Sequence, residues 1–233
     1  MGVKLKSDFN EVYDHWFDND GDIIFERNSR SGMSRPEMLK QLEEWDFRVP
    51  FYGNPKDVAL KYQKNLGYIV SGFNSSSKLA DFLVVLHHDI DSHRGENKEI
   101  MFVSEAIAKY PNTFCTVFIP FPQNKIPQKS ESYRFLKIGK RNFWLKYHSS
   151  NDWRSNCGDV YIEFISEADA YFNKVLKSPL YAIDFVSWDT YYAVDFNIAP
   201  GIPDILLNNI SPKEIAANIK EAVIHFREEE EHG

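Results

Sequence analysis

The stretch Tyr181–Ile202 constrains the fold of this chain more than any other. Two apolar runs, Tyr181–Val186 and Tyr191–Phe196, flank the short polar link Ser187–Thr190. Runs rich in β-branched and aromatic residues on either side of a short polar link predict two antiparallel strands and a tight connection. The chain then breaks at Pro200-Gly201, so the stretch predicts a complete hairpin.

Each predicted strand of this hairpin carries an aspartate, Asp184 and Asp195, and Asn197 follows two residues later. Side chains two apart on a strand share a face, so Asp195 and Asn197 point the same way, and Asp184 joins them if the strands pair. Mg²⁺ takes a few protein oxygens and fills its shell with phosphate and water. The hairpin therefore predicts a magnesium site, with turn-capping aspartates as the alternative for this stretch alone.

The composition excludes some functions. The 233 residues are 43% hydrophobic and 15% aromatic, which suffices for one compact domain or two small ones. With 27 basic and 34 acidic residues the net charge is −7, so nucleic acid is not indicated as a partner, although a local basic groove remains open. No apolar run approaches the roughly 20 residues of a membrane helix, so no membrane partner is expected.

The cysteines and the N-terminus point to a cytoplasmic protein. Cys115 and Cys157 form no C-x-x-C motif and have no histidine at zinc spacing. We expect two buried, reduced thiols, as in cytosolic proteins. The first residues, Met-Gly-Val-Lys-Leu-Lys, lack the apolar core of a signal peptide.

The N-terminal region contains an arginine-rich polar segment. Arg27, Arg30 and Arg35 lie in or beside Asn28–Ser34, after a short strand predicted over Asp22–Arg27. We interpret the segment as a solvated loop, and an anion-binding loop is the alternative.

Helix signals follow this segment. Ser34 and Glu37 have the spacing of a capping box and predict a helix start. Asn54 opens a second helix, which Gly67 is expected to end. The Ser-rich stretch Gly72–Ser77 is a candidate boundary.

The continuous apolar run Phe82–Leu86 predicts a strand in a sheet covered on both faces. The segment His87–Lys98 follows it, and we interpret this segment as a polar loop. A zinc site is the alternative, because histidines and aspartates are zinc ligands. The candidate ligands are His87, His88, Asp89, Asp91 and His93.

The remaining chain alternates strands and helices. Gly139-Lys140 separates two apolar runs and predicts a second hairpin. Ser211 and Glu214 repeat the capping-box spacing and predict a last helix. The other expected elements are a helix over Ile100–Tyr110, a strand over Thr113–Phe121, hairpin strands over Tyr133–Ile138 and Asn142–Tyr147, a strand over Val160–Ile165 and a helix over Ser166–Leu176.

Four motifs occur in a specific order in the second half of the chain. They are Tyr133-Arg134 before a hairpin, Asp152-Trp153-Arg154-Ser155-Asn156, Ala182-Ile183-Asp184, and Val194-Asp195-Phe196-Asn197 with Pro200-Gly201. With these motifs, residues 133–226 resemble the C-terminal half of an ATP-grasp ligase. The nearest likeness is to the amino-acid ligases that add glutamate to ribosomal proteins.

The resemblance implies an α+β protein with the ATP-grasp fold, built from two α+β subdomains with antiparallel sheets. It implies a reduced, pre-grasp-like N-terminal region over residues 1–72, because the chain is short for this family. The first ATP-grasp subdomain would span residues 73–122. The second, with the metal site, would span residues 123–233.

The resemblance also implies ligands for magnesium and for the phosphates. Asp184, Asp195 and Asn197 would bind the Mg²⁺ ions on ATP, although the family more often has Glu at the position of Asp195. Arg154 and Asn156 would lie near the transferred phosphate and the second metal. A further catalytic arginine, Arg134, would meet substrate or phosphate.

The first half of the chain departs from the family. There a lysine ends the strand that corresponds to Phe82–Leu86, whereas here His87-His88 ends it. We assign Lys98 to the phosphates instead, with Lys61 and Lys64 as further candidates. Phe118, Ile119 and Phe121 resemble the hinge segment that lies along adenine.

The function implied is an ATP- and Mg²⁺-dependent carboxylate–amine ligase that works through an acyl phosphate. Its acceptor would be a small-molecule amino acid, or a peptide or protein, and the sequence leaves its oligomeric state open. Two alternatives remain. One is a non-catalytic ATP-grasp-like nucleotide-binding protein, and the other is a metal-binding or hydrolytic protein built on the histidines after Leu86.

Overall fold

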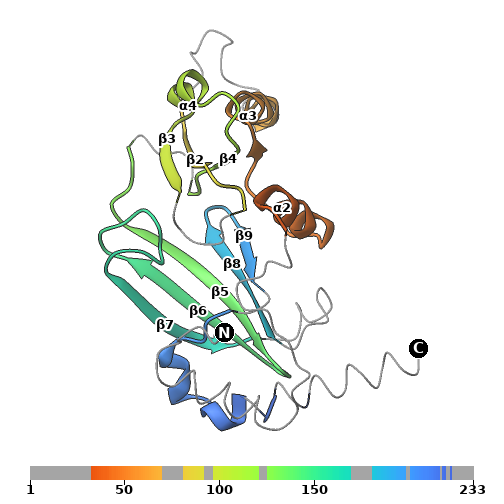
Figure 1. Ribbon diagram of the computed structural model, residues 1–233, viewed down its shortest axis with the longest axis vertical. Helices are drawn as coiled ribbons and strands as arrows, with labels where there is room; N and C mark the ends of the chain where they lie inside the picture. The colour runs from red at the N-terminus through yellow and green to blue at the C-terminus, as the bar shows by residue number, and fades with distance from the viewer. Residues whose placement is uncertain are drawn as a thin grey trace, which may run out of the picture.

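The chain forms two antiparallel sheets, a small one and a large one, with helix α2 (Arg35–Glu44) at their junction (Figure 1). The structure is a computed structural model. It describes residues 33–69, 81–91, 97–120, 125–168, 180–197, 200–215, 217–218 and 221. Within these residues, none of the helices is long and apolar enough to cross a membrane.

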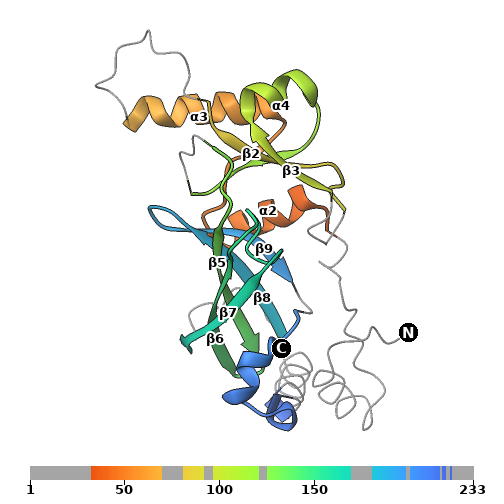
Figure 2. The ribbon, with the colours of Figure 1, turned by 90° about the vertical axis from the view of Figure 1, so that its left-hand side faces the viewer.

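The small sheet has the strand order β1-β4-β2-β3. Its strands are β1 (Tyr52–Gly53), β2 (Leu83–His87), β3 (Lys98–Phe102) and β4 (Cys115–Val117). Helices α3 (Pro55–Ile69) and α4 (Val103–Lys109) cover its outer face, the face turned away from the large sheet (Figure 2). The core between these layers includes Val58, Tyr62, Phe82, Val84, Leu86, Met101, Ala106, Cys115 and Val117.

The inner face of the small sheet is apolar as well. Leu83, Val85, Ile100 and Phe118 form a buried cluster there, and Trp153 packs against it from a loop of the other half of the chain. All five residues of β2 are buried, which confirms the expected strand with cover on both faces.

The large sheet has the strand order β7-β6-β5-β8-β9. Its strands are β5 (Ser130–Ile138), β6 (Arg141–Ser149), β7 (Val160–Glu167), β8 (Leu180–Ser187) and β9 (Tyr191–Asn197). Neighbouring strands pair antiparallel throughout, so β5–β6 and β8–β9 are the two hairpins that the sequence predicts.

The two faces of the large sheet bury different elements. Helix α2 packs Met38, Leu39 and Leu42 against one face. That face contributes Phe135, Tyr181, Ile183, Phe185, Ala193 and Phe196. The other face is covered by the 3₁₀-helix η2 (Asp204–Asn208) and the residues after it, with Leu206 and Ile210 at the contact.

Helix α2 begins at the predicted capping box. Glu37 Oε2 accepts hydrogen bonds from the Ser34 backbone N–H and from the Ser34 hydroxyl, each at 2.7 Å. These bonds lower the pKa of Glu37, because they favour the carboxylate form. Ser211 and Glu214 make the same pair of bonds further along the chain.

The structure corrects two predicted helices. Residues 100–102 belong to β3, which pairs with β2 over five register positions, and α4 begins only at Val103. The apolar run suits either element, and pairing with the buried β2 selects the strand. Ser166 and Glu167 extend β7 instead of starting a helix, and residues 169–179 lie outside the described residues.

Other expectations differ in extent. The strand expected over residues 113–121 is limited to three residues, and α3 passes Gly67 to end at Ile69. Both cysteines are free thiols, but Cys157 is only partly buried, and burial raises the pKa of Cys115 to about 12. The strand expected over residues 22–27 lies outside the described residues, and the expected domain boundaries stay a prediction.

The β5–β6 turn gives a stability prediction. Gly139 has φ +59°, and a Cβ there would clash with the backbone carbonyl of Asn218. Gly139→Ala should therefore lower the free energy of unfolding by about 1–3 kcal/mol, from left-handed strain and this clash. Gly201→Ala is the matched control, because open space surrounds Gly201. Urea unfolding measures both, and equal losses in the two variants would contradict the prediction.

Candidate active site

Three charged side chains form a row across neighbouring strands of the large sheet. In the register of β5, β8 and β9, Arg134 lies opposite Asp184, and Asp184 lies opposite Asp195. Directly opposed residues of antiparallel strands point to the same face with their Cβ atoms roughly 5 Å apart. The row therefore presents one arginine and two carboxylates side by side.

Arg134 and Asp184 form a bidentate ion pair. Arg134 donates from Nε to Asp184 Oδ1 at 2.6 Å and from Nη2 to Oδ2 at 2.8 Å. Its guanidinium also lies over the ring of Tyr147, 4.9 Å from the centroid. Burial by itself would lower the pKa of Arg134, but the negative charge of Asp184 outweighs that effect and raises it, so Arg134 stays charged.

A β-bulge aims Asp195 at this face. Phe185 lies opposite Ala193 and Asp184 lies opposite Asp195, so Val194 is an extra residue in β9. Ala193 consequently faces the α2 core, while Asp195 faces the opposite side with Asp184. Bulges of this kind often re-aim a side chain next to an active site.

Asn197 lies further along the same face. Asn197 is opposite Ala182 in the register and two residues from Asp195. Asp195 and Asn197 therefore share a face, as the sequence predicts. Asn197 is not among the residues that line the cavity described below.

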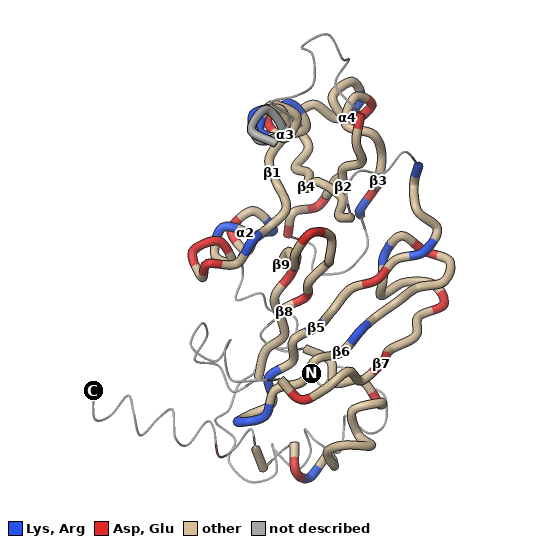
Figure 3. The backbone as a smooth tube through the Cα atoms, turned by 180° about the vertical axis from the view of Figure 1, so that it is seen from behind, with Lys and Arg blue, Asp and Glu red and all other residues tan. Residues whose placement is uncertain are grey.

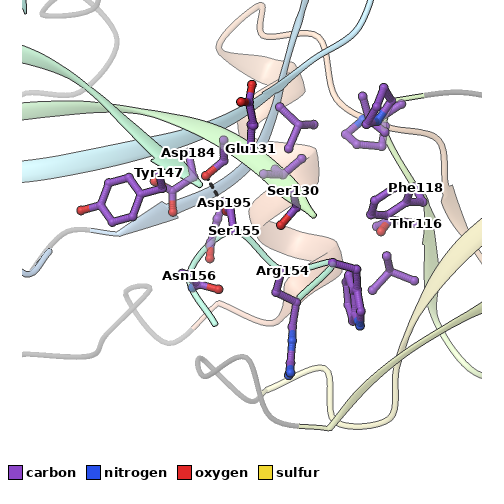
Figure 4. Close-up of a pocket in the computed structure, with 18 of the residues that line it drawn as sticks. Thr116, Phe118, Ser130, Glu131, Tyr147, Arg154, Ser155, Asn156, Asp184 and Asp195 are labelled. Carbon is purple, nitrogen blue, oxygen red and sulfur yellow. Dashed lines mark hydrogen bonds between the residues drawn. The ribbon is translucent and has the colours of Figure 1, made fainter. Parts of the chain in front are cut away.

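The loop between β6 and β7 carries the second arginine motif. Arg154 donates to Asp152 from Nε at 3.0 Å and from Nη2 at 2.9 Å, and its side chain extends away from Asp184 and Asp195 (Figure 4). Arg154 lowers the pKa of Asp152 through these bonds. Ser155 is tied to β5 by a 2.6 Å hydrogen bond between its hydroxyl and that of Ser132.

The small sheet supplies the opposite wall. Lys98 on β3 is the direct register partner of His87 at the end of β2. The pairing puts a lysine from the neighbouring strand beside the end of β2. His87 is buried, with Nε2 3.4 Å from the hydroxyl of Thr116.

These elements enclose one cavity of about 590 Å³ between the two sheets. Its charged lining residues are Arg35, Lys98, Lys129, Glu131, Arg134, Arg154, Asp184 and Asp195. Five of these are Lys or Arg and three are Asp or Glu, so the lining has an excess of two positive charges. The chain as a whole carries −7, so the cavity is a local site for an anion on an acidic protein.

Eight of the ten residues expected at the site line this cavity. They are Lys98, Phe118, Ile119, Arg134, Arg154, Asn156, Asp184 and Asp195. Asn197 is near but outside the lining, and Phe121 lies outside the described residues. Their roles remain predictions.

The sequence interpretation missed Arg35. We expected a solvated loop around it, but Arg35 is only 3% exposed and lines the cavity. The clustering of arginines was the available signal. Lys129 and Tyr147 also line the cavity, and nothing in the sequence singled them out.

The histidine-rich segment does not form a metal centre within the described residues. No three His, Cys, Asp or Glu side chains gather there as ligands, and His93 lies outside the description. His88 instead lies 3.1 Å from a Glu99 oxygen. Of the candidate lysines, Lys98 lines the cavity, whereas Lys61 and Lys64 do not.

No protein-family model matches the sequence, and no curated protein matches it. Solved structures match by fold. The ATP-grasp ligase PsnB, in complex with a minimal precursor, matches with a TM-score of 0.51 at 10% identity, over 83% of this chain and 61% of that one. The D-alanine–D-alanine ligase from Bacillus anthracis, in complex with ATP, matches with a TM-score of 0.50 at 14% identity, over 85% of this chain and 68% of that one.

The chain therefore has the ATP-grasp fold, which confirms the resemblance and the α+β fold class. It spans 61% of the length of PsnB, so the activity of the whole neighbour does not transfer with the fold.

The Asp152–Arg154 pair predicts a pH effect. Because Asp152 has a lowered pKa, the pair stabilises the fold above the unfolded value of 3.8, and this contribution is lost as the pH falls through the folded value. Arg154→Met should raise the pKa of Asp152 towards 3.8, with a stability loss under about 1 kcal/mol for so exposed a pair. Carboxyl NMR titration measures the pKa of Asp152, and Arg141→Met is the control. An unchanged pKa of Asp152 would refute the assignment.

Proposed function

We propose that the protein is an ATP- and Mg²⁺-dependent carboxylate–amine ligase. One observation carries this proposal: a positively charged cavity with two opposed carboxylates, Asp184 and Asp195, on its floor. A polyanion suits the positive walls, and a divalent cation suits the paired carboxylates. A metal–nucleotide complex supplies both charges in one ligand.

The donor set fits Mg²⁺. Two carboxylates lie directly opposite one another and an amide side chain follows on the same face, so the face offers the oxygen donors that Mg²⁺ takes. Asp184, Asp195 and Asn197 would hold the ion. When bound, the metal neutralises phosphate charge and polarises the phosphoryl oxygens, an effect worth several kcal/mol at the transition state.

Residues of the two sheets would hold the phosphates from both sides. Lys98 approaches from β3, while Arg134 lies on the floor and Asn156 on the β6–β7 loop. Arg154 reaches a phosphate if it exchanges Asp152 for the anion. On the small-sheet side, Phe118 and Ile119 offer an apolar surface for adenine. Trp153 packs against Phe118, with their ring centroids 6.2 Å apart.

The reaction has two balanced steps. A carboxylate oxygen of the acid attacks the γ-phosphorus of ATP, ADP leaves, and an acyl phosphate forms. The amine then attacks the acyl carbon, inorganic phosphate leaves, and the nitrogen releases a proton. Arg134 and Lys98 would stabilise the charge that develops on the phosphoryl oxygens.

The substrates are an acid and an amine of the amino-acid or peptide class. PsnB is a ligase that was solved with a minimal precursor, and the Bacillus anthracis enzyme is a D-alanine–D-alanine ligase, which supports this choice.

A second candidate is a nucleotide-binding protein without catalysis. Two observations favour it: His87 ends β2 in place of the family's lysine, and Arg154 is committed to Asp152.

Turnover decides between the two functions. We expect Mg²⁺-dependent ADP release that rises when a matching amino acid or peptide is added. Asp195→Ala should reduce this rate by 100-fold or more, on the order of what loss of a metal ligand costs, and Asn197→Ala should reduce it less. Asp189→Ala is the matched control, because Asp189 lies at the tip of the same hairpin and pairs with Arg48.

The outcomes separate cleanly. Nucleotide binding by calorimetry with no ADP release across a panel of amino acids and short peptides would support the non-catalytic candidate. Turnover that survives Asp195→Ala would show that the metal assignment is wrong.

A further inference from the structure

We call Asp184 and Asp195 together the carboxylate platform. Arg35, a buried residue from the N-terminal part of the chain, lies beside this platform. It is the first residue of α2, and its side chain is 4% exposed. Its Nη1 donates to the Val194 carbonyl at 3.0 Å, and its Nη2 lies 3.7 Å from Asp195 Oδ2. Arg35 therefore contacts both the bulged residue of β9 and the carboxylate that the bulge aims at the cavity.

Two features hold Arg35 in this position. Its backbone N–H donates to the Ile90 carbonyl at 2.8 Å, which ties the start of α2 to the segment after β2. Met38, one turn later, packs in the core beneath β9, and its sulfur accepts a hydrogen bond from the Phe196 N–H at 3.4 Å. The start of α2 is thus held between the segment after β2 and the large sheet.

Each carboxylate of the platform has an arginine beside it. Arg134 pairs with Asp184, and the buried Arg35 lies beside Asp195. Figure 3 shows acidic positions on the β8–β9 hairpin, and both basic and acidic positions on the neighbouring helix α2. The guanidinium groups of Arg35 and Arg134 repel a bare divalent cation that approaches these carboxylates. A phosphate chain, in contrast, is attracted by both arginines.

We propose that Arg35 disfavours binding of Mg²⁺ alone, so that Mg²⁺ binds to the site together with the nucleotide and not before it. Arg35 opposes Mg²⁺ alone at Asp195 and holds the phosphate chain, so it is a nucleotide-binding residue supplied by the N-terminal region. This inference rests on the proposed magnesium and nucleotide site.

The test measures two affinities by calorimetry, for Mg²⁺ alone and for ADP in the presence of EDTA. Arg35→Gln removes the charge and keeps a donor for the Val194 carbonyl. We expect it to bind Mg²⁺ alone about tenfold more tightly and metal-free ADP about tenfold more weakly than the wild type. Arg48→Gln is the matched control, because exposed Arg48 pairs with Asp189 at the tip of the same hairpin, and it should change neither affinity.

The opposite signs distinguish this role from a structural one. If Arg35→Gln weakens both affinities together, or changes neither while the wild type binds ADP, the inference is wrong and the proposed function stands. If the wild type binds ADP neither with EDTA nor with Mg²⁺ present, the proposed function fails, and the titrations with Mg²⁺ alone still test the effect of Arg35 on Asp195.

A second variant covers the case in which Arg35→Gln does not fold, as judged by circular dichroism. Asp195→Asn removes the negative charge that Arg35 faces, so metal-free ADP should bind more tightly than to the wild type. Unchanged or weaker binding of metal-free ADP to Asp195→Asn would also overturn the inference.

Discussion

The ion pair between Arg134 and Asp184 is the interaction on which the candidate site depends. It joins β5 to β8 at directly opposed positions and is bidentate. The pair is partly buried, so removing one partner leaves the other charge without compensation at the edge of the cavity. Its position follows from the strand register, which the apolar residues on the two faces of the sheet determine, since a slip of one residue would exchange those faces. The site and the core are therefore specified by the same pairing.

The electrostatic asymmetry of the molecule supports the same conclusion. An acidic chain that concentrates five basic side chains around one cavity repels anions elsewhere on its surface and attracts them there. In the proposed function, the paired carboxylates would favour a metal-bound polyanion over a metal-free one. Both halves of the chain contribute to this arrangement. Arg35 and Lys98 come from the first half, and Arg134 and the two carboxylates come from the second.

Local patterns in the sequence predicted the large sheet and most of the site. Alternation and turn residues define β5–β6 and β8–β9, and side chains two apart on a strand share a face wherever the strand packs. The motif order grouped Arg134, Arg154 and Asp184, and all three line the same cavity because they lie on this sheet or its loops, while their roles stay predictions. Lys98 was harder to place, because its position depends on pairing with His87, which no local pattern reveals.

Features that depend on tertiary contacts could not be predicted from the sequence. Arg35 looks like a loop residue, and only the docking of α2 against β9 carries it into the cavity. The bulge at Val194 arises from pairing with β8, and it leaves no mark in the composition of β9. The end of β3, residues 100–102, was predicted as the start of a helix, because its apolar residues suit either element until β2 is beside them.

A crystal structure with ATP and Mg²⁺ tests the central claim most directly. We expect the phosphate chain between Lys98 and the Arg134–Asp184–Asp195 row, with Mg²⁺ held by oxygens of Asp184 and Asp195 and adenine beside Phe118. A nucleotide bound outside this cavity, or a metal held by neither aspartate, would contradict the claim.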